Sequence, residues 1–143
     1  MRNLKLIRVN LRQHLSIHYF RRLKGELTKI IKDEIDKNGN ECDLNHIDVS
    51  KITNLSYLFY NSHFNGDISQ WDVSNVQTME NMFCDSYFNG DISEWDVSSV
   101  RSMKRMFENS KFNGDISQWD VSSVWDMSGM FFNASNFDQD ISM

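Results

Sequence analysis

Residues 64–122 contain nearly the same eleven-residue string three times: FNGDISQWDVS (64–74), FNGDISEWDVS (88–98) and FNGDISQWDVS (112–122). The copies begin 24 residues apart. A degenerate copy, DLNHIDVS (43–50), precedes them, and a partial copy, DISM (140–143), follows. A period of about 20–50 residues is typical of architectures in which each repeat packs against its neighbours. The sequence therefore predicts four repeats and the start of a fifth. The four are residues 43–66, 67–90, 91–114 and 115–139.

Apolar residues occupy the same positions in every repeat. Trp71 and Val73 are two residues apart, which predicts that they share one face of a short strand. The apolar residues of 76–83 are spaced as on the buried side of a short helix, with Ser74 as its N-cap. Asn65-Gly66 suits a turn with positive φ. We expect an α/β repeat: a short, right-handed, leucine-rich-repeat-like solenoid of parallel strands and short helices.

Charge divides the chain into two parts. Residues 1–38 contain ten Lys+Arg and four Asp+Glu, a net charge of +6, whereas residues 39–143 contain five and sixteen, a net charge of −11. Leucines and isoleucines within 22–38 recur every three or four residues, which predicts an amphipathic helix. We therefore expect a basic N-terminal segment (1–42) with a capping helix, and a repeat domain (43–143). The basic segment either docks on the acidic repeats or serves as an arm for nucleic acid or membranes.

Several function classes find no support in the sequence. No apolar run is long enough for a membrane helix, and the first twenty residues lack the apolar core of a secretory signal, so a cytoplasmic location is expected. Cys42 and Cys84 do not form a disulfide framework. No nucleophile elbow, phosphate-binding loop or zinc-binding motif occurs. We expect neither an enzyme nor a bound cofactor.

The repeat pattern DISxWDVSxVxxMxxMFxxSxFNG resembles the BspA-like leucine-rich-repeat family, which also occurs as a repeat of mycoplasma-type surface lipoproteins. The resemblance covers residues 43–143. It implies a bacterial repeat protein that serves in binding and adhesion and has no catalytic site.

Aspartate recurs at two positions of the repeat. The first ladder is Asp43, Asp67, Asp91, Asp115 and Asp140, and the second is Asp48, Asp72, Asp96 and Asp120. Stacked repeats would bring like charges close together, which is unfavourable without compensation. Two remedies are open: hydrogen bonds from neighbouring backbone N–H groups, as in Asx turns, or bound Ca²⁺.

Positions that differ between repeats are those that the scaffold does not dictate, so they are candidates for partner binding. We select the aromatic and basic residues among them, since such residues anchor protein interfaces. They are Tyr57, Tyr60, Arg101, Lys104, Arg105, Lys111, Trp125 and Phe132. The alternative is that the basic residues form a solvated face and that Trp125 and Phe132 cover the last turn.

These observations favour a non-catalytic protein-binding module. One form is a small intracellular bacterial or phage protein that inhibits or adapts a partner, such as an anti-defence inhibitor whose target is a protein or nucleoprotein complex. The other is the surface, adhesin-type module that the family resemblance implies. DISM does not resemble a cap, so we expect an open C-terminal end that exposes part of the layer around Trp119 and that can form a homodimer.

Overall fold

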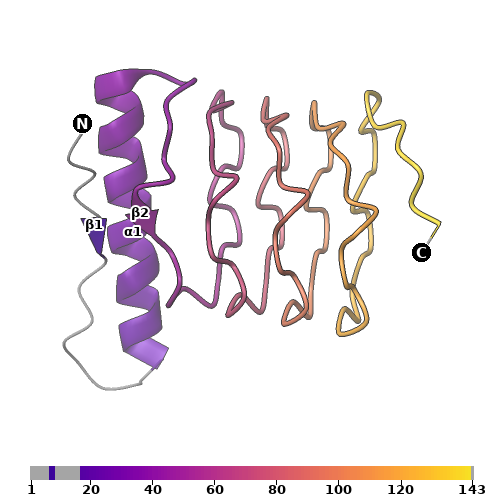
Figure 1. Cartoon of the computed structure of the whole chain (residues 1–143), viewed down its shortest axis with the longest axis horizontal. Helices are drawn as coiled ribbons and strands as arrows, with labels where there is room; N and C mark the ends of the chain where they lie inside the picture. The colour runs from indigo at the N-terminus through magenta and orange to yellow at the C-terminus, as the bar shows by residue number, and fades with distance from the viewer. Residues whose placement is uncertain (1–6, 9–16, 143) are drawn as a thin grey trace.

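A computed structural model describes residues 7–8 and 17–142 (Figure 1). Helix α1 (Ile17–Asn38) lies at one end of the molecule, and the repeats follow beside it one after another. Strands β1 (Ile7–Arg8) and β2 (Ile47–Asp48) form a two-residue parallel pair, with Ile7 opposite Ile47. The strand pair thus joins the N-terminal segment to the first repeat.

The predicted α/β solenoid of leucine-rich-repeat type, with parallel strands and short helices, is wrong. In the described residues, α1 is the one helix and β1–β2 the one strand pair, and β2 is the only one of these three elements within the repeats. Each repeat is instead a layer of consecutive turns. Adjacent layers are joined by isolated parallel bridges, such as those from Thr78 to Asn54 and to Ser102.

Left-handed backbone explains why residues 76–83 and their counterparts are not helical. Two positions in every layer have positive φ. The first holds Tyr57, Asn81, Arg105 and Gly129, and the second holds Asn61, Asp85, Asn109 and Asn133. A right-handed helix requires negative φ at every residue. The three-residue apolar spacing therefore results from a succession of turns, and Ser74 caps no helix.

Backbone hydrogen bonds join residues 55–61, and the equivalent residues of the next two layers, to the layer that follows; others, such as Gln77 N–H to the Thr53 carbonyl, run the opposite way. Phe59 N–H donates to the Met82 carbonyl at 2.9 Å, and Phe83 N–H donates to the Met106 carbonyl at 2.9 Å. The N–H groups of Leu55, Tyr57 and Asn61 donate to the second layer in the same way, and their counterparts in the second and third layers donate to the layer that follows. Each of the first three layers thus presents N–H donors to the layer that follows it.

Aromatic rings form two continuous columns through the layers. One consists of Phe59, Phe83, Phe107 and Phe131, whose successive ring centroids are 5.6 Å apart. The other consists of Phe64, Phe88, Phe112 and Phe137, at 6.1–6.4 Å. Trp71, Trp95 and Trp119 lie beside these columns, and each indole N–H donates to a backbone carbonyl of the preceding layer. The constant apolar positions are therefore the core of the fold.

Helix α1 covers the N-terminal side of this core. It begins at Ile17, five residues before the predicted start, and Leu23, Leu27 and Ile31 are buried in the core. The helix ends where Gly39 adopts a φ of 88° and donates its N–H to the Ile35 carbonyl at 2.7 Å. No helix in the described ranges is long and apolar enough to cross a membrane.

The glycines of the Asn-Gly pairs serve a different purpose from the one predicted. Gly66 does not have positive φ. A Cβ atom there would lie 1.9 Å from the Cys42 carbonyl oxygen and 2.7 Å from the Phe64 ring. Glycine is therefore required for the close approach of two backbone segments.

Trp119 is better covered than the sequence indicated. It is only 4% exposed, so the expectation that it lies in an exposed part of the last layer is wrong. Its indole N–H donates to the Ile92 carbonyl at 3.0 Å. Phe137 continues the Phe112 column at 6.2 Å, so the aromatic packing extends into the last layer.

Candidate protein-binding surface

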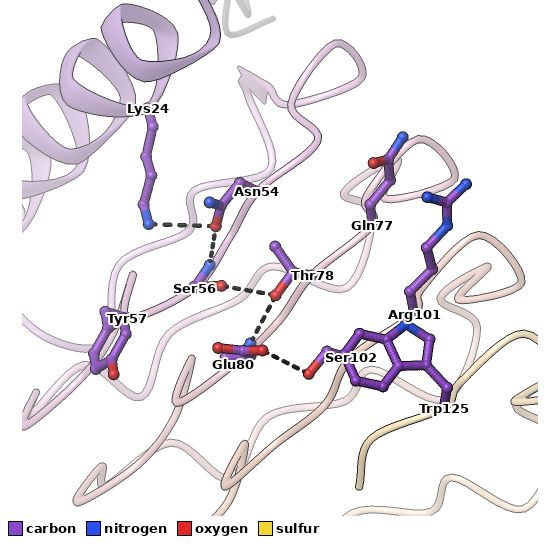
Figure 2. Close-up of a pocket in the computed structure, with 10 residues that line it drawn as sticks. All are labelled: Lys24, Asn54, Ser56, Tyr57, Gln77, Thr78, Glu80, Arg101, Ser102 and Trp125. Carbon is purple, nitrogen blue, oxygen red and sulfur yellow. Dashed lines mark hydrogen bonds between the residues drawn. The ribbon is translucent and has the colours of Figure 1, made fainter. Parts of the chain in front are cut away.

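A groove of about 570 Å³ runs across all four layers and reaches α1 (Figure 2). It brings together three of the residues predicted to bind a partner, Tyr57, Arg101 and Trp125. These residues come from three different layers. Arg101 and Trp125 occupy the same position of successive repeats, and Tyr57 lies four residues after that position in the first repeat. The remaining lining residues are Lys24, Asn54, Ser56, Gln77, Thr78, Glu80 and Ser102.

The floor of the groove is a chain of polar side chains that satisfy one another. Lys24 Nζ donates to Asn54 Oδ1 at 3.4 Å, and the Ser56 and Thr78 hydroxyls are 3.0 Å apart. Ser102 Oγ donates to Glu80 Oε1 at 2.8 Å. Figure 2 shows Tyr57 and Trp125 at opposite ends of this chain. The groove therefore has a fixed polar floor between two aromatic ends.

Both signs of charge are present in the groove. Partial burial lowers the pKa of Lys24 from its ordinary value, and Glu80 is held by the Ser102 hydroxyl. Arg101 is exposed and makes no ion pair with the described residues, and Trp125 is 75% exposed. The guanidinium and the indole are thus available to a partner.

A second hollow, of about 400 Å³, contains three more of the predicted residues, Lys104, Arg105 and Phe132. Arg105 Nε lies 3.2 Å from Glu108 Oε2, and Phe132 is 66% exposed. Arg105 is one of the left-handed residues, and its side chain is exposed. The hollow therefore combines a large apolar ring with two cations.

The other predicted residues lie outside the two cavities. Tyr60 packs edge-to-face on Tyr57, with ring centroids 5.7 Å apart, so it lies beside the groove. Lys111 is exposed but lines neither cavity. Sequence reasoning did not select Tyr87, which is exposed and stacks on His63 at 4.6 Å. Tyr87 could have been selected from the sequence, because its position in the repeat holds a different residue in each copy.

Sequence reasoning also did not predict the polar floor of the groove. Ser56, Thr78 and Ser102 are buried or half-buried hydroxyl residues, and Glu80 lies between two of them. In register, Thr78 and Ser102 share one position of the repeat, whereas Ser56 aligns with Glu80. No single repeat contains the hydrogen-bonded chain, because its members come from adjacent layers.

The aspartate ladders are networks of Asx turns. Asp96 Oδ1 accepts hydrogen bonds from the Ser98 hydroxyl at 2.6 Å and from the Ser98 N–H at 3.1 Å. The same N–H contact to the residue two positions on recurs at every ladder position. These bonds lower the pKa of several members below the ordinary Asp value. They are Asp67, Asp91 and Asp115, chiefly through the backbone N–H, and Asp96, Asp120 and Asp140, chiefly through the hydroxyl.

Neither thiol has the properties of a nucleophile. Cys84 is buried, and burial followed by the nearby Asp85 carboxylate raises its pKa to about 12. Burial also raises the pKa of Cys42. In the part of the chain that the structure describes, no three His, Cys, Asp or Glu side chains are grouped to hold a metal ion.

Comparisons with known proteins give one family. Residues 27–143 match the family described as Mycoplasma protein of unknown function, DUF285. No curated protein and no solved structure was found to match the chain. The match begins within α1 and includes all four layers, so it covers most of the chain. The chain belongs to this Mycoplasma protein family, DUF285.

Proposed function

We propose that the chain is a non-catalytic protein-binding repeat protein and that its contact surface is the groove together with the adjoining hollow. The observation that carries the proposal is the contrast between constant and variable positions. The repeated Phe, Trp and Met positions are buried in the inner layers, whereas Trp125 and Phe132 are 75% and 66% exposed. Large apolar side chains in such positions add nothing to the core, and aromatic anchors are what protein interfaces commonly use.

The charge around these anchors indicates the chemistry of the partner. Residues 39–143 contain five Lys+Arg, and four of these lie within 101–111. Arg101 lines the groove, and Lys104 and Arg105 line the hollow. A basic surface on an otherwise acidic domain favours a partner segment that carries carboxylates beside an apolar side chain.

The role that we favour is that of an inhibitor or adaptor, which acts by occupying a partner's surface. The alternative is a surface, adhesin-type module, for which the resemblance to BspA-like repeats is the support. Fractionation of the native host distinguishes the two. Recovery of the protein with the cytosol supports the inhibitor or adaptor, and recovery at the cell surface supports the adhesin.

Site-specific photo-crosslinking in the native host tests the binding surface. p-Benzoylphenylalanine replaces Trp125 in one variant and Gln118 in a control variant. Gln118 is exposed like Trp125, but it occupies a position that holds only Gln or Glu in the three intact copies of the repeat. We expect a discrete protein adduct from position 125 and none from position 118.

The adduct should also depend on the basic residues. Arg101→Ala, introduced into the variant with the probe at position 125, should reduce the yield, because the guanidinium lies in the same groove as the probe. Equal adducts from positions 118 and 125, or none from either, would contradict the proposal.

A further inference from the structure

Among the described residues that line the groove, Lys24 is the only lysine. Its side chain extends from α1 to the floor, where Nζ donates to Asn54 Oδ1 at 3.4 Å (Figure 2). Asn54 Oδ1 also accepts the Ser56 N–H at 2.8 Å, so the amine shares this oxygen. The amine makes no ion pair with the described residues, and residues 1–22 contain no Asp or Glu. Lys24 thus reaches the groove without a carboxylate partner.

Two other lysines of the same helix are paired with carboxylates. Lys29 Nζ lies 3.1 Å from Asp33 Oδ2, and Lys32 is paired with Asp36. The hydrogen bond and the charge of Asp36 raise the pKa of Lys32, whereas partial burial lowers the pKa of Lys24. At a given pH, more of Lys24 is therefore the neutral amine, which is the nucleophilic form of lysine.

The groove gives a small reagent access to this amine. Lys24 is only half-buried, and it lines a space of about 570 Å³. A neutral amine still has two N–H groups, so it can keep its contact with Asn54 while its lone pair stays free. Arg101 lines the same groove and favours an anionic reagent. These properties suit an acyl phosphate, which is small and anionic and carries an activated acyl group.

We propose that Lys24 is an acylation site, at which an acyl phosphate converts the amine into a neutral amide. The amine nitrogen attacks the carbonyl carbon of the reagent, and the N–C bond forms. The C–O bond to the phosphoryl group breaks, inorganic phosphate leaves with the electron pair, and the nitrogen releases one proton to water. No oxidation state changes in this step, and the acyl phosphate supplies the whole acyl group.

Acylation removes the positive charge that Lys24 brings to the groove. This consequence rests on the proposed function, in which the partner segment carries carboxylates. The modified groove should bind such a partner more weakly, so the reaction regulates binding. The acylation itself requires no partner.

Site-resolved kinetics on the whole purified chain test the acylation site. Acetyl phosphate at pH 8 is the probe, and peptide mass spectrometry gives the initial acetylation rate of each lysine. We expect Lys24 to react at least about threefold faster than each of Lys29, Lys32 and Lys51, because a larger fraction of Lys24 is neutral. A rate at Lys24 equal to or below the rates of these three lysines would overturn the proposal.

Asn54→Asp tests the local cause, because it places a carboxylate at the oxygen that Lys24 contacts. The fourth repeat has Asp126 at this position, and its Oδ1 accepts the Ser128 N–H at 2.9 Å, so the layer tolerates aspartate there. The variant should slow acetylation of Lys24 to the rates of the other lysines. Gln118→Glu adds the same charge at an exposed position where the third repeat has Glu94, and it should leave the rate at Lys24 unchanged. An unchanged rate in Asn54→Asp, or equal slowing in both variants, would contradict the proposal.

Two variants of Lys24 test the consequence for binding, in the chain with p-benzoylphenylalanine at position 125. Lys24→Gln resembles the neutral amide and should lower the yield of the adduct, whereas Lys24→Arg keeps the charge and should preserve the yield. Equal yields from the two variants would show that acylation of Lys24 does not regulate binding. If the chain with unaltered Lys24 gives no adduct, the proposed function is wrong, and the acetylation rates still decide whether Lys24 is the acylation site.

Discussion

Asn61 provides a test of the turn-built layer, because glycine and alanine have opposite effects in a helix and in a left-handed turn. Asn61 has a φ of 51°, its side chain is exposed, and that side chain makes no hydrogen bond with the described residues. Left-handed backbone costs alanine about 1–2 kcal/mol, whereas glycine adopts it freely. We therefore expect Asn61→Gly to be more stable than Asn61→Ala by about 1 kcal/mol or more in urea unfolding.

Gly25 is the matched control for this comparison. It lies within α1, and an added Cβ there would meet nothing within 4 Å. Gly25→Ala should therefore stabilise the protein by about 0.5–1 kcal/mol. The reasoning would be refuted if alanine were the more stable residue at position 61 as well, since that result is expected of a helix.

Three other predictions concern close packing, the aspartates and the buried thiol. Gly66→Ala should destabilise the protein by about 3 kcal/mol or more in urea unfolding, because the new Cβ meets the Cys42 carbonyl. A loss of stability below about 1 kcal/mol would show that the backbone segments around Gly66 and Cys42 separate easily. Folding lowers the pKa of Asp96, so the carboxylate stabilises the protein above pH 3.8, its ordinary pKa, and this contribution is lost as the pH falls through the folded pKa. The urea midpoint should therefore fall less steeply between pH 7 and pH 2 in Asp96→Asn, which keeps the acceptor oxygen but does not titrate. With a pKa of about 12, Cys84 should react with a thiol reagent at pH 8 about 10³-fold more slowly than a free cysteine; rapid labelling in the native Cys42→Ser variant would contradict this.

The sequence predicted which residues lie in the core, but it did not predict the local backbone. The 24-residue period identifies the repeated Phe, Trp, Val and Met positions, and the residues at these positions in the inner layers are buried. Apolar residues three apart occur both in a helix and in successive turns, so the period alone does not distinguish the two. Asn61 and its counterparts Asp85, Asn109 and Asn133 were the available signal, since Asn and Asp tolerate positive φ.

The candidate surface could be predicted only in part for a similar reason. Trp125 and Phe132 are identifiable from sequence because large apolar residues replace smaller or polar ones at variable positions. The grouping of Tyr57 with Trp125 across 68 residues, and the contact of Lys24 with Asn54, depend on how the layers and α1 align. That alignment is set by backbone bonds between layers, which leave no trace in the side-chain pattern.

The affinity of the crosslinked partner for the purified chain tests the central claim most directly. Trp125→Ala should weaken binding at least about tenfold, or 1.4 kcal/mol, because a 75%-exposed indole in a groove is the expected anchor. The thermal stability of Trp125→Ala should equal that of the unchanged protein, since the Trp125 side chain adds little to the core. Gln118→Ala should alter neither quantity. Unchanged affinity in Trp125→Ala, or equal losses in the two variants, would contradict the account.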